Sequence, residues 1–475
     1  MVIMSKLLDS IEQAIDACEL RDGMTVSFHH HLRNGDQITS MVLNAIARKG
    51  ITGLKLAHSS IMDGMTRDGM IDMVRQGVIA EVDTNGSSTV IGGLVTTGAF
   101  STVVRYRTHG GRAKAITSGE LAIDVAFVAA PAADALGNCN GIVGPRACGS
   151  LGYPMDDARH ARKTVVITDT LMPYPLQQVT IDETVVDYVV AVDCIGDPAG
   201  IATGVLAAPR DPLALILAEN ASQAILHSGL FKEGFSFQAG ASGPAIATTR
   251  NVHAMMQKHK VHGSFLLGGS TSYSVAMLED GLFDTLLDVQ CFDTKAVASL
   301  RDNSRHQEIS ASRYANPEMK SCAVNQLDVV ILGALQVDSN FDVNVHMEST
   351  GYFTSGSGGH GDTAQGAAMT VIVAPLTRSR FPTFVPKVLC RSTPGENIDV
   401  VATQFGLTVN PRRADLHVRF KEAGLKMMPM EELVDMAEKI TGKPAPLHRG
   451  DRIVAEIMHR DGLVLDRIPQ LLPKK

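Results

Sequence analysis

The sequence predicts an α/β protein built from two tandem open α/β modules, followed by a C-terminal helical tail. Three observations lead to this prediction: the chain repeats itself, its apolar runs are short and rich in β-branched residues, and amphipathic helical segments lie between those runs. A chain of 475 residues is long enough for roughly two or three domains. The repeat favours two modules and an extension.

The internal repeat sets the domain organisation. Matching segments lie about 210 residues apart and follow the same order in both halves. Residues 22–28 match 233–239, and the apolar run 124–128 matches 328–332. The other matches join 54–56 to 265–267, 69–72 to 281–284, 165–167 to 371–373, Pro175 to Pro386, and 187–190 to 399–402. Each pair alone is weak, but their shared order predicts a duplicated module.

Each module is expected to contain a parallel sheet. The runs 124–130, 164–168 and 328–335 are continuous, apolar and rich in β-branched residues, as is typical of strands that are buried on both faces. Between such runs, residues 37–49 place apolar side chains on one face, which predicts an amphipathic helix. Alternating strands and helices indicate an open α/β sheet in each half.

The boundaries between these parts follow from the repeat. We expect the first module over residues 1–210 and the second over 211–412, because two prolines flank the point where the repeat begins again. Residues 413–475 then form a C-terminal extension. It contains a predicted helix, residues 430–441, which begins after a proline and ends before a glycine.

The composition argues against several classes of function. The net charge is -7 and the sequence pI is about 6.1, whereas nucleic-acid binding usually needs a basic surface. The seven cysteines are scattered without a C-x-x-C spacing, so we expect neither disulfides nor a metal site. The longest apolar runs fall far short of the roughly 18 residues that cross a bilayer, and residues 1–13 lack a signal-peptide core. We expect a cytoplasmic protein that binds neither nucleic acid nor membrane.

A loop with three consecutive histidines is the first candidate site. Residues 27–36 follow a predicted strand and precede a predicted helix, which is where open α/β sheets bind ligands. Imidazoles and a guanidinium beside a helix N-terminus suit a substrate rich in carboxylates. A structural role and a metal site are the alternatives, but the nearby residues lack a zinc-binding spacing. The predicted substrate-binding residues are His29, His30, His31, Arg33, Asn34 and Gly35.

Two glycine-containing loops in the second half are further candidates. Residues 355–362 follow Glu348 and lie between a predicted strand and a predicted helix. Glycines let the backbone approach a ligand closely, and successive N–H groups can stabilise an oxyanion; a simple turn is the alternative. Residues 238–244 are the counterpart of the histidine loop in the repeat, and they are interpreted either as a ligand-binding loop or as a plain turn.

A basic cluster surrounds two glycines in the first half. Its members are Arg105, Arg107, Arg112 and Lys114, and the glycines are Gly110 and Gly111. Such a cluster could bind a phosphate chain. A solvated surface hairpin is the interpretation that we favour.

The motifs and the duplication together resemble the CoA-transferase superfamily. More closely, residues 27–36 are similar to a signature of citrate lyase alpha subunits, and residues 345–351 with 355–362 resemble the second-module site of that family. The similarity extends over essentially the whole chain. It implies two tandem CoA-transferase-like modules and an enzyme that exchanges acetyl for citryl on an acyl-carrier thioester.

This resemblance also implies substrates, partners and residue roles. The substrates would be citrate, acetate, acetyl-CoA, and acyl-CoA or the CoA-like prosthetic arm of a carrier subunit, with no tightly bound cofactor. The partners would be the beta (lyase) and gamma (acyl carrier) subunits, and the isolated chain would form a homo-oligomer. The implied catalytic residues are Glu348, Gly358, Gly359 and His360. The residues implied to bind the CoA or carrier arm are Gly240, Gly243, Ser355, Gly356, Gly361 and Asp362.

One departure from the superfamily indicates the route of the reaction. Covalent CoA-transferases place a nucleophilic glutamate two residues before a glycine, whereas here Ser349 takes that place and Glu348 is one residue earlier. On a strand, a shift of one residue reverses the face that a side chain occupies. The resemblance therefore implies a mixed anhydride without a covalent enzyme thioester.

Other functions fit parts of the same pattern. An ordinary CoA-transferase or an acyl-CoA hydrolase would use free CoA with the same fold. A non-catalytic scaffold or ligand sensor would reuse the fold without the chemistry, because a fold alone does not determine a function.

Overall fold

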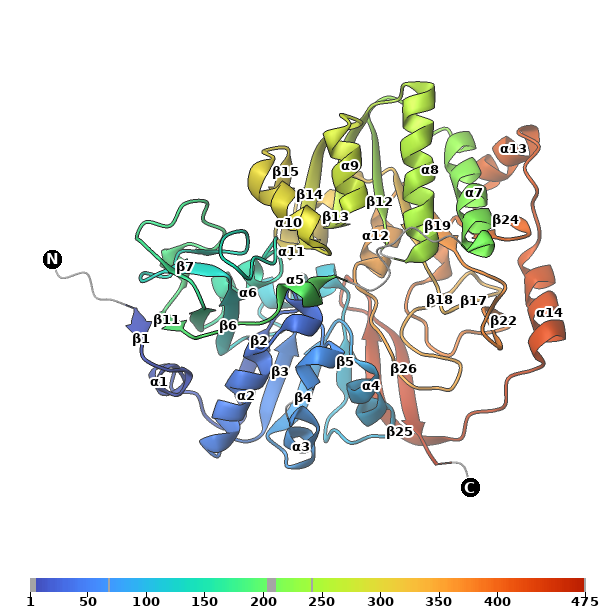
Figure 1. The fold of residues 1–475 in the computed structure, drawn as a ribbon. Helices are drawn as coiled ribbons and strands as arrows, with labels where there is room; N and C mark the ends of the chain where they lie inside the picture. The colour runs from blue at the N-terminus through green and yellow to red at the C-terminus, as the bar shows by residue number, and fades with distance from the viewer. Residues whose placement is uncertain (1–5, 67–68, 203–210, 241, 474–475) are drawn as a thin grey trace.

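The computed structural model describes residues 6–66, 69–202, 211–240 and 242–473, and it places two large sheets side by side (Figure 1). The first sheet contains, in spatial order, β1 (Leu7–Leu8), β11 (Tyr188–Ala191), β9 (Lys163–Thr168), β6 (Val125–Ala130), β2 (Thr25–Phe28), β3 (Leu54–His58), β4 (Ile79–Thr84), β5 (Val104–Tyr106), β25 (Arg449–Met458) and β26 (Val464–Leu471). Apart from the pair β25–β26, neighbouring strands of this sheet are parallel.

The second sheet repeats the arrangement of the first. It contains, in spatial order, β15 (His306–Glu308), β14 (Phe283–Cys291), β13 (Gly263–Ser270), β12 (Phe235–Ala239), β16 (Val329–Leu332), β19 (Met369–Val373), β23 (Val400–Thr403) and β24 (Gly406–Val409). The series β11-β9-β6-β2-β3-β4-β5 corresponds strand for strand to β23-β19-β16-β12-β13-β14-β15. The predicted duplication of an open α/β module is therefore confirmed.

One of the predicted segment matches is wrong. Gly69 precedes the helix α3 (Met70–Arg75), whereas Gly281 leads into the strand β14. The structural counterpart of Gly281 is Gly77, which likewise ends a helical segment shortly before a strand, β4. Four residues of similar composition were too few to distinguish a helix start from a strand start.

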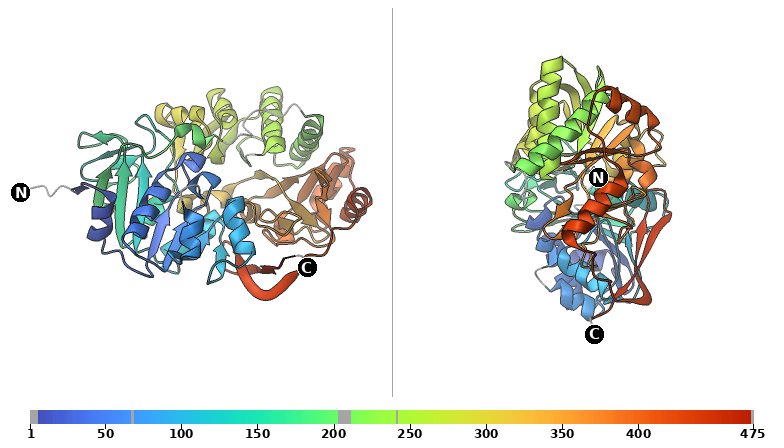
Figure 2. Two further views of the ribbon diagram at one scale, coloured as in Figure 1. Left: turned by 60° about the horizontal axis from the view of Figure 1, so that its bottom comes forward. Right: turned by 90° about the vertical axis from the view of Figure 1, so that its right-hand side faces the viewer.

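Helices pack against both sheets, and short strands form small sheets beside them (Figure 2). The helices are α1 (Ile11–Ala17), α2 (Ile38–Arg48), α3, α4 (Thr89–Thr96), α5 (His109–Thr117), α6 (Pro154–His160), α7 (Pro212–His227), α8 (Gly243–His259), α9 (Ser272–Glu279), α10 (Thr294–Asp302), α11 (Ala311–Ala315), α12 (His360–Gly366), α13 (Ala414–Glu422) and α14 (Met430–Thr441). The short strands are β7 (Ala132–Asp134), β8 (Cys139–Asn140), β10 (Leu171–Met172), β17 (Gln336–Asp338), β18 (Val343–Asn344), β20 (Thr377–Arg378), β21 (Phe381–Pro382) and β22 (Phe384–Val385). No helix within the described ranges is both long and apolar enough to cross a membrane.

The predicted strands of the two modules form the core. Every residue of β6, β16 and β19 is buried, which matches the continuous apolar runs in the sequence. The predicted helix over residues 37–49 is α2, whose Val42, Ala45 and Ile46 are fully buried. Removing these apolar faces from water is the main stabilising contribution to each module.

The C-terminal extension is helical only in its first part. Helix α14 occupies the predicted residues, but the chain then returns to the first module. There β25 pairs in parallel with β5, and β26 pairs with β25, as the red strands beside β5 in Figure 1 show. The prediction of a helical tail over residues 413–475 is thus corrected for residues 449–471, which form a strand hairpin. The repeat contains no counterpart of this hairpin that could have predicted it.

The junction between the modules stays a prediction. It was placed between residues 210 and 211, and residues 203–210 lie outside the described residues. Helix α7 begins at Pro212, directly after this segment.

The two modules hold each other through equivalent carboxylates. Asp156 of the first module accepts a hydrogen bond from the backbone N–H of Ser312, at the start of α11, over 2.7 Å. Asp362 of the second module accepts one from the backbone N–H of Gly110, at the start of α5, over 3.0 Å. Each carboxylate lies at the positive end of a helix of the other module. Helices α5 and α11 therefore meet at the junction (Figure 1).

The basic cluster is part of this junction. Residues 109–117 form α5, so the favoured interpretation as a surface hairpin is wrong. The buried guanidinium of Arg107 lies 2.9 Å from a carboxylate oxygen of Asp83 and 2.8 Å from one of Glu120. The guanidinium of Arg112 donates two hydrogen bonds to the carboxylate of Asp157. Because these guanidiniums are neutralised inside the protein, they are not available to a phosphate chain.

Two adjacent glycines in α4 test the packing between the modules. A Cβ atom on Gly92 would lie 2.1 Å from the carbonyl oxygen of Phe353 in the second module, whereas a Cβ atom on Gly93 would meet nothing within 4 Å. We predict that Gly92→Ala lowers the free energy of unfolding by about 2 kcal/mol. Gly93→Ala should leave it unchanged or raise it by about 1 kcal/mol, because alanine favours helix. Urea unfolding of both variants measures this difference, and equal stabilities would contradict the interface.

Candidate active site

The two modules enclose two cavities that share a wall. The smaller has a volume of about 310 Å³ and is lined by residues that include His30 and Arg33. The larger has a volume of about 490 Å³ and is lined by residues that include Gln238 and Tyr314. The residues that line both are His109, Phe292, Ser355, Gly356 and Gly358. The histidine loop and the glycine turn, residues 355–359, thus meet at one cleft.

The three histidines point in alternating directions. The rings of His29 and His31 stack on each other with their centroids 6.1 Å apart. The ring of His30 instead stacks on His109 and Tyr153, with centroids 5.8 and 4.8 Å away. This alternation continues that of β2, in which successive side chains point to opposite faces. Of the three predicted histidines, only His30 lines the smaller cavity.

Burial keeps these imidazoles neutral. It lowers the pKa of His29 and of His30 far below the ordinary value, and that of His31 to about 4. His31 donates a hydrogen bond from Nε2 to the carbonyl oxygen of Ala129 over 2.8 Å, and His30 Nδ1 lies 2.6 Å from the hydroxyl of Ser59. The histidine loop therefore supplies no positive imidazole at neutral pH, and the hydrogen bond of His31 holds the loop against β6.

Arg33 is the cation of the smaller cavity. Its guanidinium carbon lies 5.0 Å from the centroid of the Phe292 ring. Within the described part of the chain no carboxylate pairs with Arg33, unlike Arg107 and Arg112. Burial lowers the pKa of Arg33, but a guanidinium stays charged in proteins. An unpaired and largely buried guanidinium is suited to bind a substrate carboxylate in a bidentate manner.

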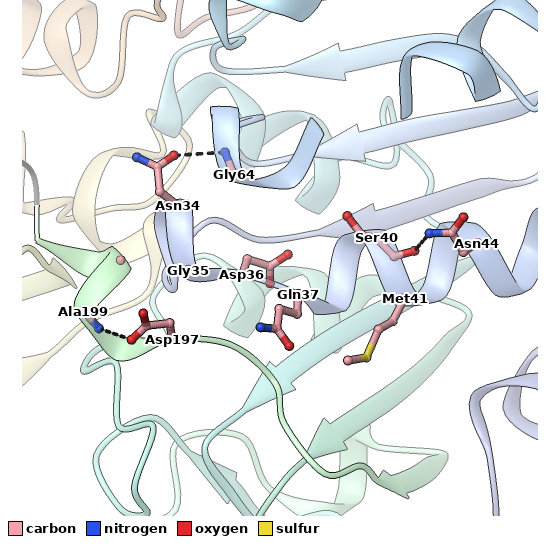
Figure 3. Close-up of a pocket in the computed structure, with 11 residues that line it drawn as sticks. Asn34, Gly35, Asp36, Gln37, Ser40, Met41, Asn44, Gly64, Asp197 and Ala199 are labelled. Carbon is pink, nitrogen blue, oxygen red and sulfur yellow. Dashed lines mark hydrogen bonds between the residues drawn. The ribbon is translucent and has the colours of Figure 1, made fainter. Parts of the chain in front are cut away.

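Asn34 and Gly35, also predicted to bind substrate, lie away from this cleft. They line a separate cavity of about 750 Å³, together with residues of α2 (Figure 3). Asn34 accepts a hydrogen bond on Oδ1 from the backbone N–H of Gly64 over 3.2 Å. A Cβ atom on Gly35 would lie 1.9 Å from the carbonyl oxygen of Asp197. These contacts fix the loop to its neighbours, and neither residue lines the cleft with Arg33.

The first module holds the glycine turn in place. Gly356 forms an isolated β-bridge with Gly86, and a Cβ atom on Gly356 would lie 2.4 Å from the Cα of Gly86. The side chain of Asn85 accepts a hydrogen bond from the N–H of Gly358 over 3.0 Å. It also donates one to the carbonyl oxygen of Gly358 over 3.0 Å. Backbone contact and a two-point amide clamp therefore set the position of the turn.

Several backbone N–H groups of the turn have no acceptor in the part of the chain that the structure describes. Among the described residues, no hydrogen bond engages the N–H of Ser357 or of Gly359, whereas the N–H of Gly358 is taken by Asn85. A Cβ atom on Gly359 would lie 2.3 Å from the hydroxyl of Tyr314, so that only glycine fits there. Free N–H groups on a fixed turn can stabilise an oxyanion, which is the role predicted for this loop.

The residues after the turn position it. His360 lines the larger cavity, but it donates from Nε2 to the carbonyl oxygen of Gly333 over 3.0 Å, and its Nδ1 accepts from the hydroxyl of Thr393 over 2.8 Å. Burial lowers the pKa of His360 to about 4. With both nitrogens engaged, His360 has no free position for proton transfer. Gly361 packs against the start of α5. There the carboxylate of Asp362 accepts hydrogen bonds from the hydroxyl of Thr108 and the backbone N–H of Gly110.

The predicted arm-binding residues are divided between the larger cavity and its surroundings. Gly240 and Ser355 line the larger cavity, and the hydroxyl of Ser355 donates to the carbonyl oxygen of Val345. Gly243 is the first residue of α8 and is absent from the lining of the cavity, although the preceding Ser242 belongs to it.

Glu348, predicted to be catalytic, lies outside the cleft. Its side chain is exposed, and it lines neither of the two cavities. Its backbone N–H bonds to the carbonyl oxygen of Tyr352, and its own carbonyl accepts from Gly351, so it occupies a turn at the surface. The geometry does not support contact between this carboxylate and a bound thioester.

Several cleft residues were missed by the sequence reasoning. They are Asn85, His109, Tyr153, Gln290 and Tyr314. Asn85 follows the carboxyl end of β4, and a search of every strand end would have found it. His109 and Tyr314 come from short helices at the junction of the modules, and no spacing in the sequence reveals that these helices meet.

The chain matches a family of known proteins over almost its entire length. Residues 4–471 match the family model described as citrate lyase, alpha subunit. The citrate lyase alpha chain of Klebsiella pneumoniae is 44% identical over 466 residues, covering 98% of this chain and 91% of that one. The alpha chain of Escherichia coli (strain K12) is 43% identical with the same coverage. The chain belongs to the citrate lyase alpha subunit family.

Solved structures agree with this assignment. The alpha subunit of citrate lyase from Streptococcus mutans, whose crystal structure is described as a complex with citrate, is 45% identical with a TM-score of 0.97. The match covers 100% of this chain and 92% of that one. The malonate decarboxylase alpha subunit of Acinetobacter baumannii shares the fold, with a TM-score of 0.66 at 15% identity, and covers 93% of both chains. Like other citrate lyase alpha subunits, this chain is a transferase subunit with a CoA-transferase-like fold.

The amide clamp of Asn85 generates a prediction. In Asn85→Ala the glycine turn loses both hydrogen bonds of the clamp, and we expect kcat to fall at least tenfold. The free energy of unfolding should fall by about 1–3 kcal/mol, since two buried backbone groups lose a partner. Steady-state kinetics at a temperature where circular dichroism shows a folded variant measure this effect. An unchanged kcat in the folded variant would contradict a role for the position of the turn.

Proposed function

We propose that this chain exchanges acetyl for citryl on the thioester of an acyl carrier and releases acetate. The observation that carries the proposal is the shared cleft: an unpaired guanidinium lines one cavity, and a glycine turn with free N–H groups separates it from a larger second cavity. The membership of the citrate lyase alpha subunit family agrees with such a reaction. Citrate would occupy the smaller cavity and the acetyl thioester the larger one.

Arg33 would bind one carboxylate of citrate in the smaller cavity. The remaining carboxylates would accept hydrogen bonds from polar groups of the same lining, among them Ser60, Ser87 and His30. Because the pKa of His30 is far below the ordinary value, its imidazole would act as a neutral partner. One strong cation and several neutral donors suit a substrate that must enter and also leave.

The reaction would proceed in two acyl transfers. A citrate carboxylate attacks the acetyl carbonyl carbon, the C–S bond breaks, and the thiolate leaves behind a mixed citric–acetic anhydride. The thiolate then attacks the citryl carbonyl carbon of this anhydride, and acetate leaves with the bridging oxygen. No net proton is transferred, so the chemistry needs neither a general acid nor a general base.

Both transfers build negative charge on a carbonyl oxygen. The N–H groups of Ser357 and Gly359 would stabilise this oxyanion, at about 3–4 kcal/mol for each well-placed donor. Holding citrate and thioester together in one cleft would contribute up to about 7–11 kcal/mol more. The exposed position of Glu348 supports a route without a covalent enzyme thioester.

The substrate arm and the partners follow from the same proposal. The physiological thioester would be the CoA-like prosthetic arm of the gamma (acyl carrier) subunit, and a beta (lyase) subunit would cleave the citryl thioester in a multi-subunit complex in the cytoplasm. An ordinary CoA-transferase with free CoA is the nearest alternative. A panel of carboxylic acids offered with acetyl-CoA separates the two, because the citrate enzyme should prefer the tricarboxylate.

The role of Arg33 can be tested by substitution. We predict that Arg33→Ala raises the apparent KM for citrate at least tenfold, because a charge-assisted hydrogen bond contributes about 1.5–3 kcal/mol. The KM for acetyl-CoA should change little. Arg250→Ala, which removes an exposed arginine from α8, serves as the control and should leave both constants unchanged. An unchanged KM for citrate in Arg33→Ala would remove this residue from the site.

The pH dependence of citrate binding follows from the neutral histidines. Burial lowers the pKa of His30 far below its usual range and that of His109 to about 3. These imidazoles are therefore neutral, and Arg33 is charged, throughout the range from about pH 7 to about pH 8.5. We predict a constant KM for citrate across this range. A tenfold rise of the KM for citrate towards the upper end of this pH range would show that a positively charged histidine contributes to binding.

An isotope experiment tests the route directly. With citrate carrying ¹⁸O in its carboxylates and enzyme in excess over acetyl-CoA, the proposed route transfers one labelled oxygen to acetate in the first turnover. A covalent route would release unlabelled acetate in that turnover, because the oxygen would come from the enzyme carboxylate. Glu348→Gln should retain most of its kcat in the same assay. Unlabelled acetate and an inactive Glu348→Gln would establish the covalent route instead.

A further inference from the structure

The hydroxyl of Tyr314 lies on the glycine turn, inside the larger cavity. A Cβ atom on Gly359 would lie 2.3 Å from the phenol oxygen, so the hydroxyl takes the space that a side chain at this position would need. Tyr314 is buried, lines the larger cavity and comes from α11, the helix that Asp156 of the first module holds. The hydroxyl is therefore fixed beside Gly359, whose N–H has no acceptor among the described residues.

The proton of this hydroxyl has no acceptor among the residues that the structure describes. Gln238 donates from Nε2 to the phenol oxygen of Tyr314 over 3.0 Å, and within the described residues this is the hydrogen bond of the hydroxyl. Because the oxygen acts as an acceptor there, the O–H itself remains free to donate. Burial raises the pKa of Tyr314, so the phenol stays protonated.

Gln238 is itself held in a fixed position. It lies near the end of β12, is 8% exposed, and packs against the backbone of Gly268, whose φ is +105°. Its Oε1 is buried and has no partner among the described residues. Because the buried amide of Gln238 donates to the phenol oxygen from a fixed position, it limits the directions in which the hydroxyl proton of Tyr314 can point.

We propose that Tyr314 is a catalytic residue that donates its hydrogen bond to the thioester carbonyl oxygen as this oxygen becomes negative, and that Gln238 is the positioning residue for that proton. This inference rests on the proposed acyl transfer. Tyr314 adds a side-chain donor to the backbone donors of the turn. Since neither transfer step consumes a proton, the phenol keeps its proton and only shares it with the oxyanion.

The two residues can be tested with a matched set of variants. Tyr314→Phe keeps the ring and removes the donor, and we expect kcat to fall about a hundredfold. The KM for citrate should change less than threefold, because citrate lies in the other cavity. Gln238→Glu keeps the hydroxyl of Tyr314 but places a carboxylate acceptor beside it, so that the hydroxyl proton turns away from the cavity. We expect kcat of this variant to fall at least tenfold. Tyr352→Phe, at an exposed tyrosine, is the control and should be unchanged.

A spectroscopic measurement separates catalysis from folding. The ketone analogue of acetyl-CoA, in which a methylene separates sulfur from the carbonyl, binds without reacting. Its infrared carbonyl band should lie at lower frequency on the wild-type enzyme than on Tyr314→Phe. Equal bands together with an unchanged kcat would overturn the role of Tyr314 while leaving the acyl transfer intact. A wild-type enzyme that forms no citryl-CoA from acetyl-CoA and citrate would overturn both.

Discussion

The contact between Gly86 and Gly356 is the constraint on which the cleft depends. Two backbones from different modules approach so closely that neither position has room for a Cβ atom. Because of this contact, the amide of Asn85 reaches both polar groups of Gly358, and the turn is held without help from a ligand. A preorganised turn loses no free energy on reordering when charge develops, which is why fixed backbone donors are effective in catalysis.

The duplication accounts for the two similar sheets. Differences between equivalent positions of the two modules account for a site beside the glycine turn of the second module. Tyr153 and Gly359 occupy equivalent positions, each directly before a helix, α6 or α12. In the first module the position carries a phenol that packs on His30 and His109. In the second module it carries no side chain, and the space is taken by the hydroxyl of Tyr314. The equivalent positions thus carry a phenol of their own in one half and accept a phenol from another helix in the other.

The sequence was a good guide wherever the determining interaction is local or periodic. The buried strands, helix α2, helix α14 and the duplicated order followed from apolar runs, helical periodicity and capping residues. The hairpin β25–β26 did not, because its place in the first sheet depends on the distant strand β5. In the site, Arg33 and residues 355–359 were found from loop composition. The orientation of His29 and His31 into the first module follows the alternation of β2 and its packing inside that module. The contribution of Tyr314 depends on how the two modules meet.

The proposed reaction requires citrate and the acyl thioester to meet across the glycine turn. A crystal structure with citrate and the unreactive ketone analogue of acetyl-CoA bound together would show whether they do. We expect a citrate carboxylate on the guanidinium of Arg33, and the ketone oxygen within hydrogen-bond distance of the N–H of Gly359. Citrate bound elsewhere, for example beside Asn34 in the separate cavity, or a ketone oxygen remote from the turn, would contradict it.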